Sequence, residues 1–402
     1  MMNKKTLVWL GVVCVVAIAA AIAIDHSRKP VSEHSAQAGN LVDDLAEQIN
    51  DVIAVKISTP GQQSAVTLER GEKGWVVADK GGYPADVGKL REYLLRVADS
   101  SLIEQKTASR ERYADLGVAD LSEPDAKGIQ VAIEGLAKPV DFIAGVFNTK
   151  AAGTYVRRND EAQSWLAKGN LIADRNAKDW LQKDLANINA DRIASVTITQ
   201  ADGKTLRVFK NAPEDTQYSI ADLPKGREPV SDYAASGLAS ALADLRIDDV
   251  APVSDVAPAE SATRVRFTTF EGINVDGSIW TQGDIRYASF VASLEKDLAE
   301  QYLQAAQQDI ASDPASDADD NGAAEDGRGP DEPADADEDA AETETRQSLP
   351  DLESEVARLN SAFNGWSFVL PAHKISSMTK TMDEMLKPLE EKASADGKKS
   401  VK

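Results

Sequence analysis

Residues 53–79, IAVKISTPGQQSAVTLERGEKGWVVAD, and residues 193–222, IASVTITQADGKTLRVFKNAPEDTQYSIAD, share one pattern of strands and turns. In both stretches apolar residues alternate with polar ones, as is typical of half-buried strands. Turn residues, such as Pro60-Gly61 and Asp202-Gly203, separate the apolar runs, and both stretches end in Ala-Asp. Each stretch therefore predicts an antiparallel meander, and their similarity predicts an internal duplication.

A helix is predicted after each meander, introduced by proline in both copies. Pro84 precedes ADVGKLREYLLRVAD, and Pro229 precedes VSDYAASGLASALADL. Apolar residues recur at spacings of three and four, which places them on one helical face. We expect these faces to pack on the preceding sheets, with a partner-binding groove as the alternative. The apolar residues are Val87, Leu90, Leu94 and Val97 in the first helix, and Leu238, Leu242 and Leu245 in the second.

The two copies stay similar downstream and then end differently. IQVAIEG at 129–135 parallels VRFTTFEG at 265–272, and GTYVRR at 153–158 parallels IRYASF at 285–290. The first copy is predicted to close with an amphipathic helix over 176–188 that turns Trp180, Leu181 and Leu185 toward the core. The second is predicted to continue with a helix over 292–308, an acidic insertion, another helix, a strand over 366–370 and a final helix. That last helix carries Met378, Met382 and Met385, a stripe more typical of a core than of a cofactor site.

These patterns predict an α+β protein with an N-terminal transmembrane helix and two tandem, duplicated modules of antiparallel meander strands packed with amphipathic helices. The predicted parts are a cytoplasmic N-terminus (1–5), an anchor (6–24), a polar tether (25–45), a first module (46–190), a second module (191–308 plus 348–388), a disordered acidic insertion (309–347) and a charged tail (389–402).

The predicted anchor is the uncharged stretch TLVWLGVVCVVAIAAAIAI at residues 6–24. Nineteen helical residues at about 1.5 Å each come close to the roughly 30 Å hydrocarbon core of a bilayer. Lys4 and Lys5 before it favour a cytoplasmic N-terminus with the rest of the chain exported, although Arg28 and Lys29 weaken that bias. We therefore expect a single-pass inner-membrane protein with its bulk in the periplasm.

Two other interpretations of the N-terminus stay open. A signal peptide could be cleaved at Ala21-Ile22-Ala23, but the apolar run is longer than is typical for such a signal. A lipoprotein would lipidate Cys14, but Val13 before it is not small, and apolar residues follow. Cys14 is the only cysteine, so the exported part can form no disulfide, Cys metal site or Cys nucleophile.

The acidic insertion resembles a calcium loop at its start, DADDNGAAEDGR at residues 317–328. An EF-hand needs a bidentate acid at position twelve, where this sequence has Arg328. From 309 to 345 there are fifteen acidic residues, one arginine and almost no large apolar residue, a composition that predicts disorder. We expect a solvated loop, with weak divalent binding or docking of a basic partner as alternatives.

Composition and motifs exclude several classes of function. The formal charge of −22 argues against nucleic-acid binding, which needs clustered Lys and Arg. His26 and His34 lie in the tether, which leaves His373 without a second histidine for catalysis, and no P-loop, G-x-G-x-x-G or G-x-S-x-G occurs. We predict no catalytic, cofactor-binding or metal-binding residues. The acidic pairs Asp43-Asp44 and Asp248-Asp249 are expected at helix ends or polar edges, where the sequence does not distinguish them from solubilising charge. Arg157 and Arg158 could face an acidic partner but by default lie on an exposed sheet face.

Several of these segments resemble the domain-of-unknown-function 4340 family of bacterial membrane-anchored proteins. The resemblance covers about residues 50–388 without the acidic insertion. It rests on the anchor and on IAVKI and its echo IASVTI, GWVVAD, YPADVGKLREYLLRVADSSLIE (83–104), YADLGV (113–118), DWLQKDL (179–185) and GWSFVLPAHK (365–374). The long acidic insertion departs from the compact family pattern.

The resemblance implies an extracytoplasmic accessory protein of an ABC exporter of the gliding-motility type, with ABC transporter subunits as partners and no established enzymatic role. We therefore expect a non-catalytic, membrane-anchored accessory or assembly subunit. The alternative is a freestanding periplasmic binding module for a cell-envelope glycan or peptide, held in a cleft between the two copies. A hydrolase built around His373 is a third, weaker alternative.

The predicted topology can be tested with reporter fusions at the C-terminus. A fused alkaline phosphatase should be active and a fused fluorescent protein dark, because the anchor exports the chain. The same fusions on a chain lacking residues 2–24 should show the opposite pattern. An inactive phosphatase together with a fluorescent cytoplasm for the full chain would reverse the topology.

Overall fold

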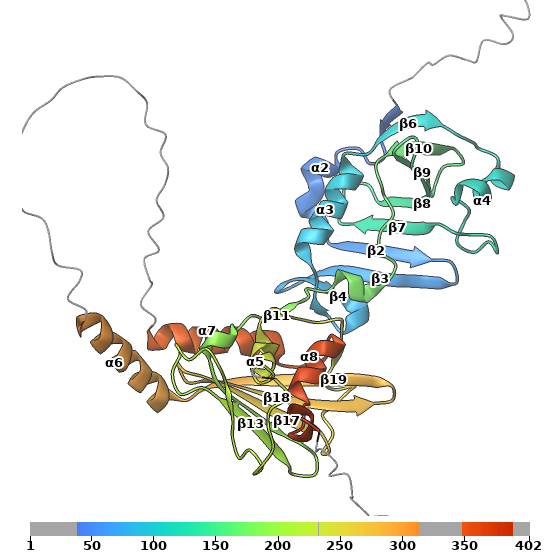
Figure 1. Cartoon of the computed structure of the whole chain (residues 1–402). Helices are drawn as coiled ribbons and strands as arrows, with labels where there is room; N and C mark the ends of the chain where they lie inside the picture. The colour runs from blue at the N-terminus through green and yellow to red at the C-terminus, as the bar shows by residue number, and fades with distance from the viewer. Residues whose placement is uncertain (1–37, 232, 313–347, 389–402) are drawn as a thin grey trace, which may run out of the picture. The chain divides into compact units, whose positions relative to one another are not determined.

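The computed structural model describes residues 38–231, 233–312 and 348–388, which form two compact units (Figure 1). Unit 1 runs to Asp79 and resumes over Val87–Trp180, and unit 2 comprises Lys80–Asp86 and the chain from Leu181 onward. The predicted modules divide the chain at residue 190, whereas the contacts divide it after Trp180 and assign Lys80–Asp86 to unit 2. The fold is α+β with mostly antiparallel sheets, as the sequence predicts.

Several predictions fall outside the described residues. They are the N-terminus at 1–5, the anchor at 6–24 with Cys14, residues 25–37 of the predicted tether with His26 and His34, the calcium-like stretch at 317–328, and the tail from residue 389. The rest of the predicted tether, residues 38–45, is part of the folded unit: it contains a strand over Ala38–Asn40 and the buried residues Leu41, Val42 and Leu45. Residues 309–312 of the predicted disordered insertion belong instead to a helix, α6 (Lys296–Ser312). This helix ends two residues before Pro314, a residue type that disfavours helical continuation.

Unit 1 is built on one long antiparallel sheet. Its strands lie in the order β1-β6-β10-β9-β8-β7-β2-β3-β4, stacked side by side in Figure 1. The predicted meander is present as β2, β3 and β4, with Val55 opposite Leu68 and Leu68 opposite Val77. The strands are β1 (Ala38–Asn40), β2 (Ala54–Thr59), β3 (Gln62–Gly71), β4 (Gly74–Val77), β6 (Ser101–Gln105), β7 (Ile129–Glu134), β8 (Val140–Asn148), β9 (Gly153–Arg158) and β10 (Ser164–Lys168).

The helix predicted after the first meander is α3 (Val87–Ala98). Leu90, Leu94 and Val97 are buried as predicted, while Val87 at the first turn is half exposed. Tyr93 meets Trp180 edge to face, with ring centroids 5.9 Å apart. The shorter helical segments of this unit are α2 (Leu45–Gln48), η1 (Ile49–Asp51), η3 (Arg110–Arg112), α4 (Tyr113–Leu116) and η4 (Ala177–Trp180).

The YADLGV segment packs against the sheet of unit 1 through α4. Tyr113, Val118 and Ala119 form a buried cluster with Ile143 of β8. The backbone approaches so closely that a Cβ added at Gly145 would lie 2.2 Å from the carbonyl oxygen of Leu116. Glycine at this position is what allows the segment to reach the sheet.

Unit 2 is built on a second antiparallel sheet, with strand order β14-β13-β12-β17-β18-β19-β20-β16. This unit contains the second predicted meander, which is formed by β12 to β14. Its first turn lies at Asp202-Gly203, where Gly203 has φ +83°. The strands are β12 (Ile193–Thr199), β13 (Thr205–Phe209), β14 (Ser219–Ile220), β16 (Asp249–Pro252), β17 (Thr263–Thr269), β18 (Ile273–Gln282), β19 (Ile285–Leu294) and β20 (Trp366–Val369). The short strands β11 (Asp184–Ala186) and β15 (Leu245–Arg246) pair separately.

Helix α7 (Leu349–Phe363) packs on β19 of this sheet. It begins with a capping box in which Ser348 and Asp351 satisfy each other's backbone amides, an arrangement that stabilises a helix start. Inside the contact, the Asn360 side chain donates to the carbonyl of Ala292 and accepts from its amide, both at 2.8 Å. Tertiary contacts therefore support the helix in addition to its own cap.

Three predicted helices are wrong or shorter than predicted. Over 176–188 the chain forms only η4 and then β11, because Leu181 pairs with Ala85 and β11 pairs with β15. Trp180, Leu181 and Leu185 are nevertheless buried as predicted. Strand pairing has overridden the helical pattern here.

The helix predicted after Pro229 is reduced to α5 (Ser236–Ala239) and η6 (Ser240–Leu242), while Leu245 lies in β15. Its sequence contains Gly237 and several serines, which are weak helix formers. The final helix stops at Met378 of α8 (Ala372–Met378), and η8 (Asp383–Met385) follows. Between them, the Thr381 amide and hydroxyl donate to Glu384 at 2.8 and 2.9 Å, a local bond that competes with helical continuation.

Replacing Gly145 with alanine should destabilise the protein by about 1–3 kcal/mol, because the new methyl group overpacks against α4. Thermal unfolding of the full chain, followed by circular dichroism, measures the effect. Gly237→Ala is the matched control, since a Cβ there meets nothing within 4 Å and alanine is the better helix former. Equal melting temperatures for Gly145→Ala and the unmodified chain would contradict this packing.

Candidate binding groove

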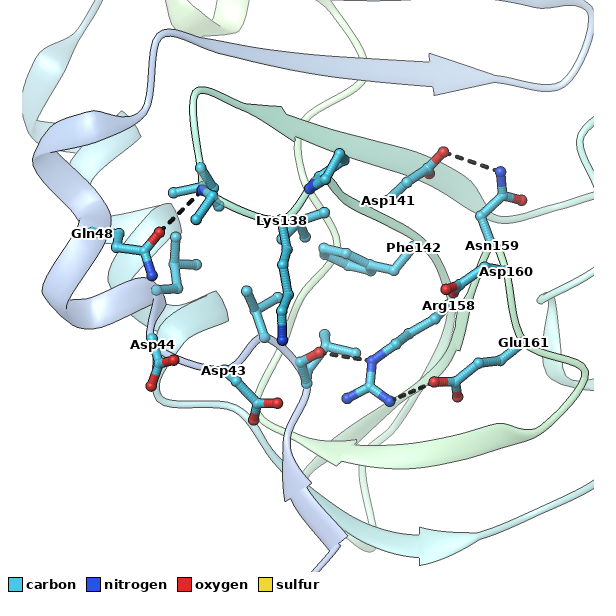
Figure 2. Close-up of a pocket in the computed structure, with 17 residues that line it drawn as sticks. Asp43, Asp44, Gln48, Lys138, Asp141, Phe142, Arg158, Asn159, Asp160 and Glu161 are labelled. Atoms are coloured by element: carbon cyan, nitrogen blue, oxygen red, sulfur yellow. Dashed lines mark hydrogen bonds and ion pairs between the residues drawn. The ribbon is translucent and has the colours of Figure 1, made fainter.

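The candidate site is an open groove of about 710 Å³ in unit 1. Three segments enclose it: the chain from β1 into α2, the turn between β7 and β8 with the start of β8, and the turn between β9 and β10 (Figure 2). Its volume lies in the range of about 300–1,000 Å³ that is usual for ligand sites. The lining residues are Leu41, Val42, Asp43, Asp44, Leu45, Gln48, Leu136, Ala137, Lys138, Pro139, Val140, Asp141, Phe142, Arg158, Asn159, Asp160 and Glu161.

Arg158 at the end of β9 holds two walls of the groove together. Its Nε donates to the carbonyl of Leu41 at 3.0 Å, and one terminal nitrogen donates to the carbonyl of Asn40 at 2.9 Å. The other terminal nitrogen pairs with Glu161 at 2.9 Å. The guanidinium thus ties the N-terminal segment to the turn between β9 and β10.

A second set of bonds fixes the remaining wall. Asp141 of β8 accepts from the side chains of Gln130 at 2.8 Å and Asn159 at 3.0 Å. The side-chain oxygen of Gln48 accepts from the amide of Ala137 at 3.2 Å, as Figure 2 shows. The wall positions are therefore set by hydrogen bonds between segments that lie far apart in the sequence.

Other charged groups at the groove are exposed and unpaired. Among the described residues, no ion pair or side-chain hydrogen bond engages Asp43, Asp44, Lys138 or Asp160. In Figure 2 the Lys138 side chain extends across the opening toward Asp43 on the opposite wall. These groups are available to a ligand.

The charge balance of the lining is negative. It carries the carboxylates of Asp43, Asp44, Asp141, Asp160 and Glu161 against two cations, Lys138 and Arg158. Within the described ranges, no group of three or more His, Cys, Asp or Glu side chains is placed to hold a metal ion. The arrangement suits reversible binding of a ligand that is mainly cationic.

A second cavity, of about 740 Å³, lies in unit 2 between β11, β15 and α7. Beside it, Arg192 makes a two-pronged pair with Glu355 at 2.9 and 3.0 Å and donates to Glu271 at 3.0 Å. Burial alone would lower the pKa of Arg192, but its bonds to the two carboxylates outweigh burial and raise it. Because this cluster joins η5 (Ala190–Arg192) just before β12, the turn before β18, and α7, we interpret it as structural.

The sequence predicts that Arg157 and Arg158 of β9 lie on an exposed sheet face, and this prediction is wrong. Arg157 is buried, donates to the carbonyl of Val118 at 3.0 Å, pairs with Asp120 and lies over the Tyr113 ring at 4.8 Å. Successive residues of a strand point to opposite faces, so Arg157 holds the α4 segment and Arg158 holds the groove. The sequence does not indicate this burial, because the carbonyl and carboxylate groups that bind the two arginines belong mostly to segments far away in the sequence.

The other residues singled out in the sequence are dispersed. His373 is exposed on α8, and Asp249 pairs with Lys80 at 2.6 Å in unit 2. Met378 and Met385 are buried, with Met382 partly so, in agreement with the predicted core role. Only Asp43-Asp44 and Arg158 belong to the groove.

Most of the groove could not be found from the sequence. The turns at 136–139 and 159–161 carry no motif, and only their polar, turn-rich composition indicates loops. Their convergence on the 41–48 segment depends on the pairing of β7, β8 and β9.

A family model described as "Domain of unknown function (DUF4340)" matches residues 75–263. This region of the chain belongs to that family, as the resemblance in the sequence implies. Comparisons with curated proteins and with solved structures find no match. Within the described ranges, the structure contains no helix that is both long and apolar enough to span a bilayer.

Replacing Arg158 with methionine should free the N-terminal segment, because two carbonyls lose their donor at a cost of about 1–3 kcal/mol. Hydrogen exchange in peptides covering residues 38–48 should then be faster by roughly tenfold. Arg91→Met is the control, since Arg91 is exposed on α3 and no described residue pairs with it. Unchanged exchange in Arg158→Met would mean that other contacts hold this wall.

Proposed function

We propose that this protein is a non-catalytic, membrane-anchored accessory or assembly subunit that acts in the periplasm beside an ABC-type transport system. In this proposal residues 6–24 form the single inner-membrane span, and the described units bind partner proteins. The family model that matches the chain assigns no function. The transporter part of the proposal therefore rests on the resemblance described in the sequence analysis.

The observation that carries the proposal is the place of the groove along the chain. One wall, residues 41–48, begins a few residues after the start of the described chain at β1. Thirteen residues, 25–37, separate β1 from the predicted anchor, and a chain of that length spans at most about 45 Å. A partner held in the groove would therefore stay close to the membrane.

The composition of the groove supports a protein partner. Exposed polar and charged groups surround it, and its walls are fixed by hydrogen bonds before any partner arrives. Preformed walls reduce the ordering cost of association. The exposed charges at the rim favour specificity and fast association.

A second candidate is a freestanding binding module for a cell-envelope glycan or peptide. The volume of the groove favours it, because a small ligand would fit. This groove lies within unit 1, whereas the sequence interpretation placed a ligand between the two copies. The two candidates differ in whether a transporter accompanies the protein.

Purification of the tagged full chain after mild detergent solubilisation should recover an ABC ATPase and its permease in fixed proportion. A chain whose residues 6–24 are replaced by a cleaved signal peptide is the control and should lose most of both subunits, because anchoring raises the effective concentration near the permease. Recovery of the full chain alone in every preparation would contradict the transporter proposal and favour the freestanding module.

A further inference from the structure

The groove of unit 1 has an uneven distribution of partnered and unpartnered charges. Arg158 and Glu161 satisfy each other, so their charges cancel. Asp43, Asp44 and Asp160 have no cation among the described residues, and Lys138 is the single free cation of the lining. The surplus of negative charge is carried by exposed side chains of the lining, which a ligand can reach.

Apolar surface accompanies these charges. Pro139 and Ala137 are exposed on one rim, and Leu136 and Val140 are partly exposed beside them. A lining of this kind can cover the aliphatic stem of a long basic side chain while the carboxylates meet its charged end. A simple inorganic cation would leave that apolar surface unused.

We infer that the groove binds an extended segment of a partner protein that carries arginine or lysine, with the basic side chain directed at Asp43 and Asp44. Lys138 on the opposite wall meets a carbonyl or carboxylate of the same segment and so orients it. This inference rests on the proposed function and names the chemistry of the partner.

The shape of the groove favours a polypeptide over a compact ligand. It is open along one side and is lined by two strand-to-strand turns and one N-terminal segment. Its walls come from loops at one end of the sheet, a usual place for recognition on a rigid scaffold. An extended chain can lie along such walls with its side chains on alternate sides.

Fluorescence anisotropy on the full chain in nanodiscs tests the inference. The probe is a fluorescein-labelled peptide, Gly-Arg-Ala-Arg-Ala-Arg-Gly, and the reference is the same peptide with Glu for each Arg. The arginine peptide should bind at least about tenfold more tightly, with an affinity that falls as salt is raised.

Substitutions at the groove test which side chains bind the peptide. Asp43→Asn with Asp44→Asn should weaken arginine-peptide binding by about three- to tenfold, in keeping with two exposed ion pairs. Asparagine tolerates the left-handed conformation of Asp44, whose φ is +59°. Lys138→Ala should weaken binding by about twofold, because the bound segment loses the cation that meets its carbonyl or carboxylate.

The matched control is Glu72→Gln with Asp125→Asn, which removes two exposed acids of unit 1 that do not line the groove. It should leave the affinity unchanged. An equal loss in both double variants would mean general attraction to an acidic protein and would overturn the inference. So would equal binding of the arginine and glutamate peptides.

The chain's own residues Arg28 and Lys29 precede β1 by ten and nine residues in the sequence, so they are tested as an alternative occupant. If Arg28→Ala with Lys29→Ala raises the affinity for the arginine peptide several-fold, the groove's occupant is the chain itself and the partner assignment is overturned. An unchanged affinity supports a segment from another protein.

Failure of the inference can be told apart from failure of the proposed function. Co-purification of the transporter subunits without selective peptide binding would reject the groove as the contact and keep the accessory role. Selective peptide binding without co-purification would keep the groove's chemistry and reject the transporter.

Discussion

Two adjacent arginines at the end of β9 connect the sheet of unit 1 to the segments around it. Arg157 and Arg158 point to opposite faces because strand side chains alternate. Arg157 is buried against the α4 segment through Val118, Asp120 and Tyr113, and a buried arginine is tolerated only where such partners exist. Arg158 holds the carbonyls of Asn40 and Leu41. The second arginine thus ties one wall of the candidate groove to the sheet, and the first ties the YADLGV segment to it.

The groove combines a fixed frame with unpaired charges. Its frame groups, such as Asp141 and Gln48, have partners within the protein. In contrast, Asp43, Asp44 and Lys138 are exposed lining residues, and the Lys138 side chain crosses the opening toward Asp43 (Figure 2). A frame of this kind lowers the entropy cost of binding, and the unpaired charges select the partner. In unit 2 the charges around Arg192 are paired within the protein instead. Arg192 binds Glu271 and Glu355, and these ion pairs hold α7 beside the sheet.

The sequence predicted the strands well and the helices less well. Alternation in IAVKI and IASVTI identifies β2 and β12, because a half-buried strand imposes a period of two on its own residues. Helical spacing succeeded for α3 but failed over 176–188, where Leu181 and Leu185 are buried in strand pairings instead. Burial was predictable in both places. The hydrogen-bonding partner was not, because it comes from residues about 60 to 100 positions away.

By itself, the sequence determined the α+β composition, the two meanders and the residues that form the cores, because these follow from the local order of apolar and polar side chains. Only the tertiary structure decided the groove. Its walls come from residues near 45, 139 and 160, and they meet because β7, β8 and β9 pair as neighbours in the sheet. The same holds for the arginine pair: exposed and buried arginines look alike in a sequence, since the carbonyls that satisfy a buried one belong to distant segments.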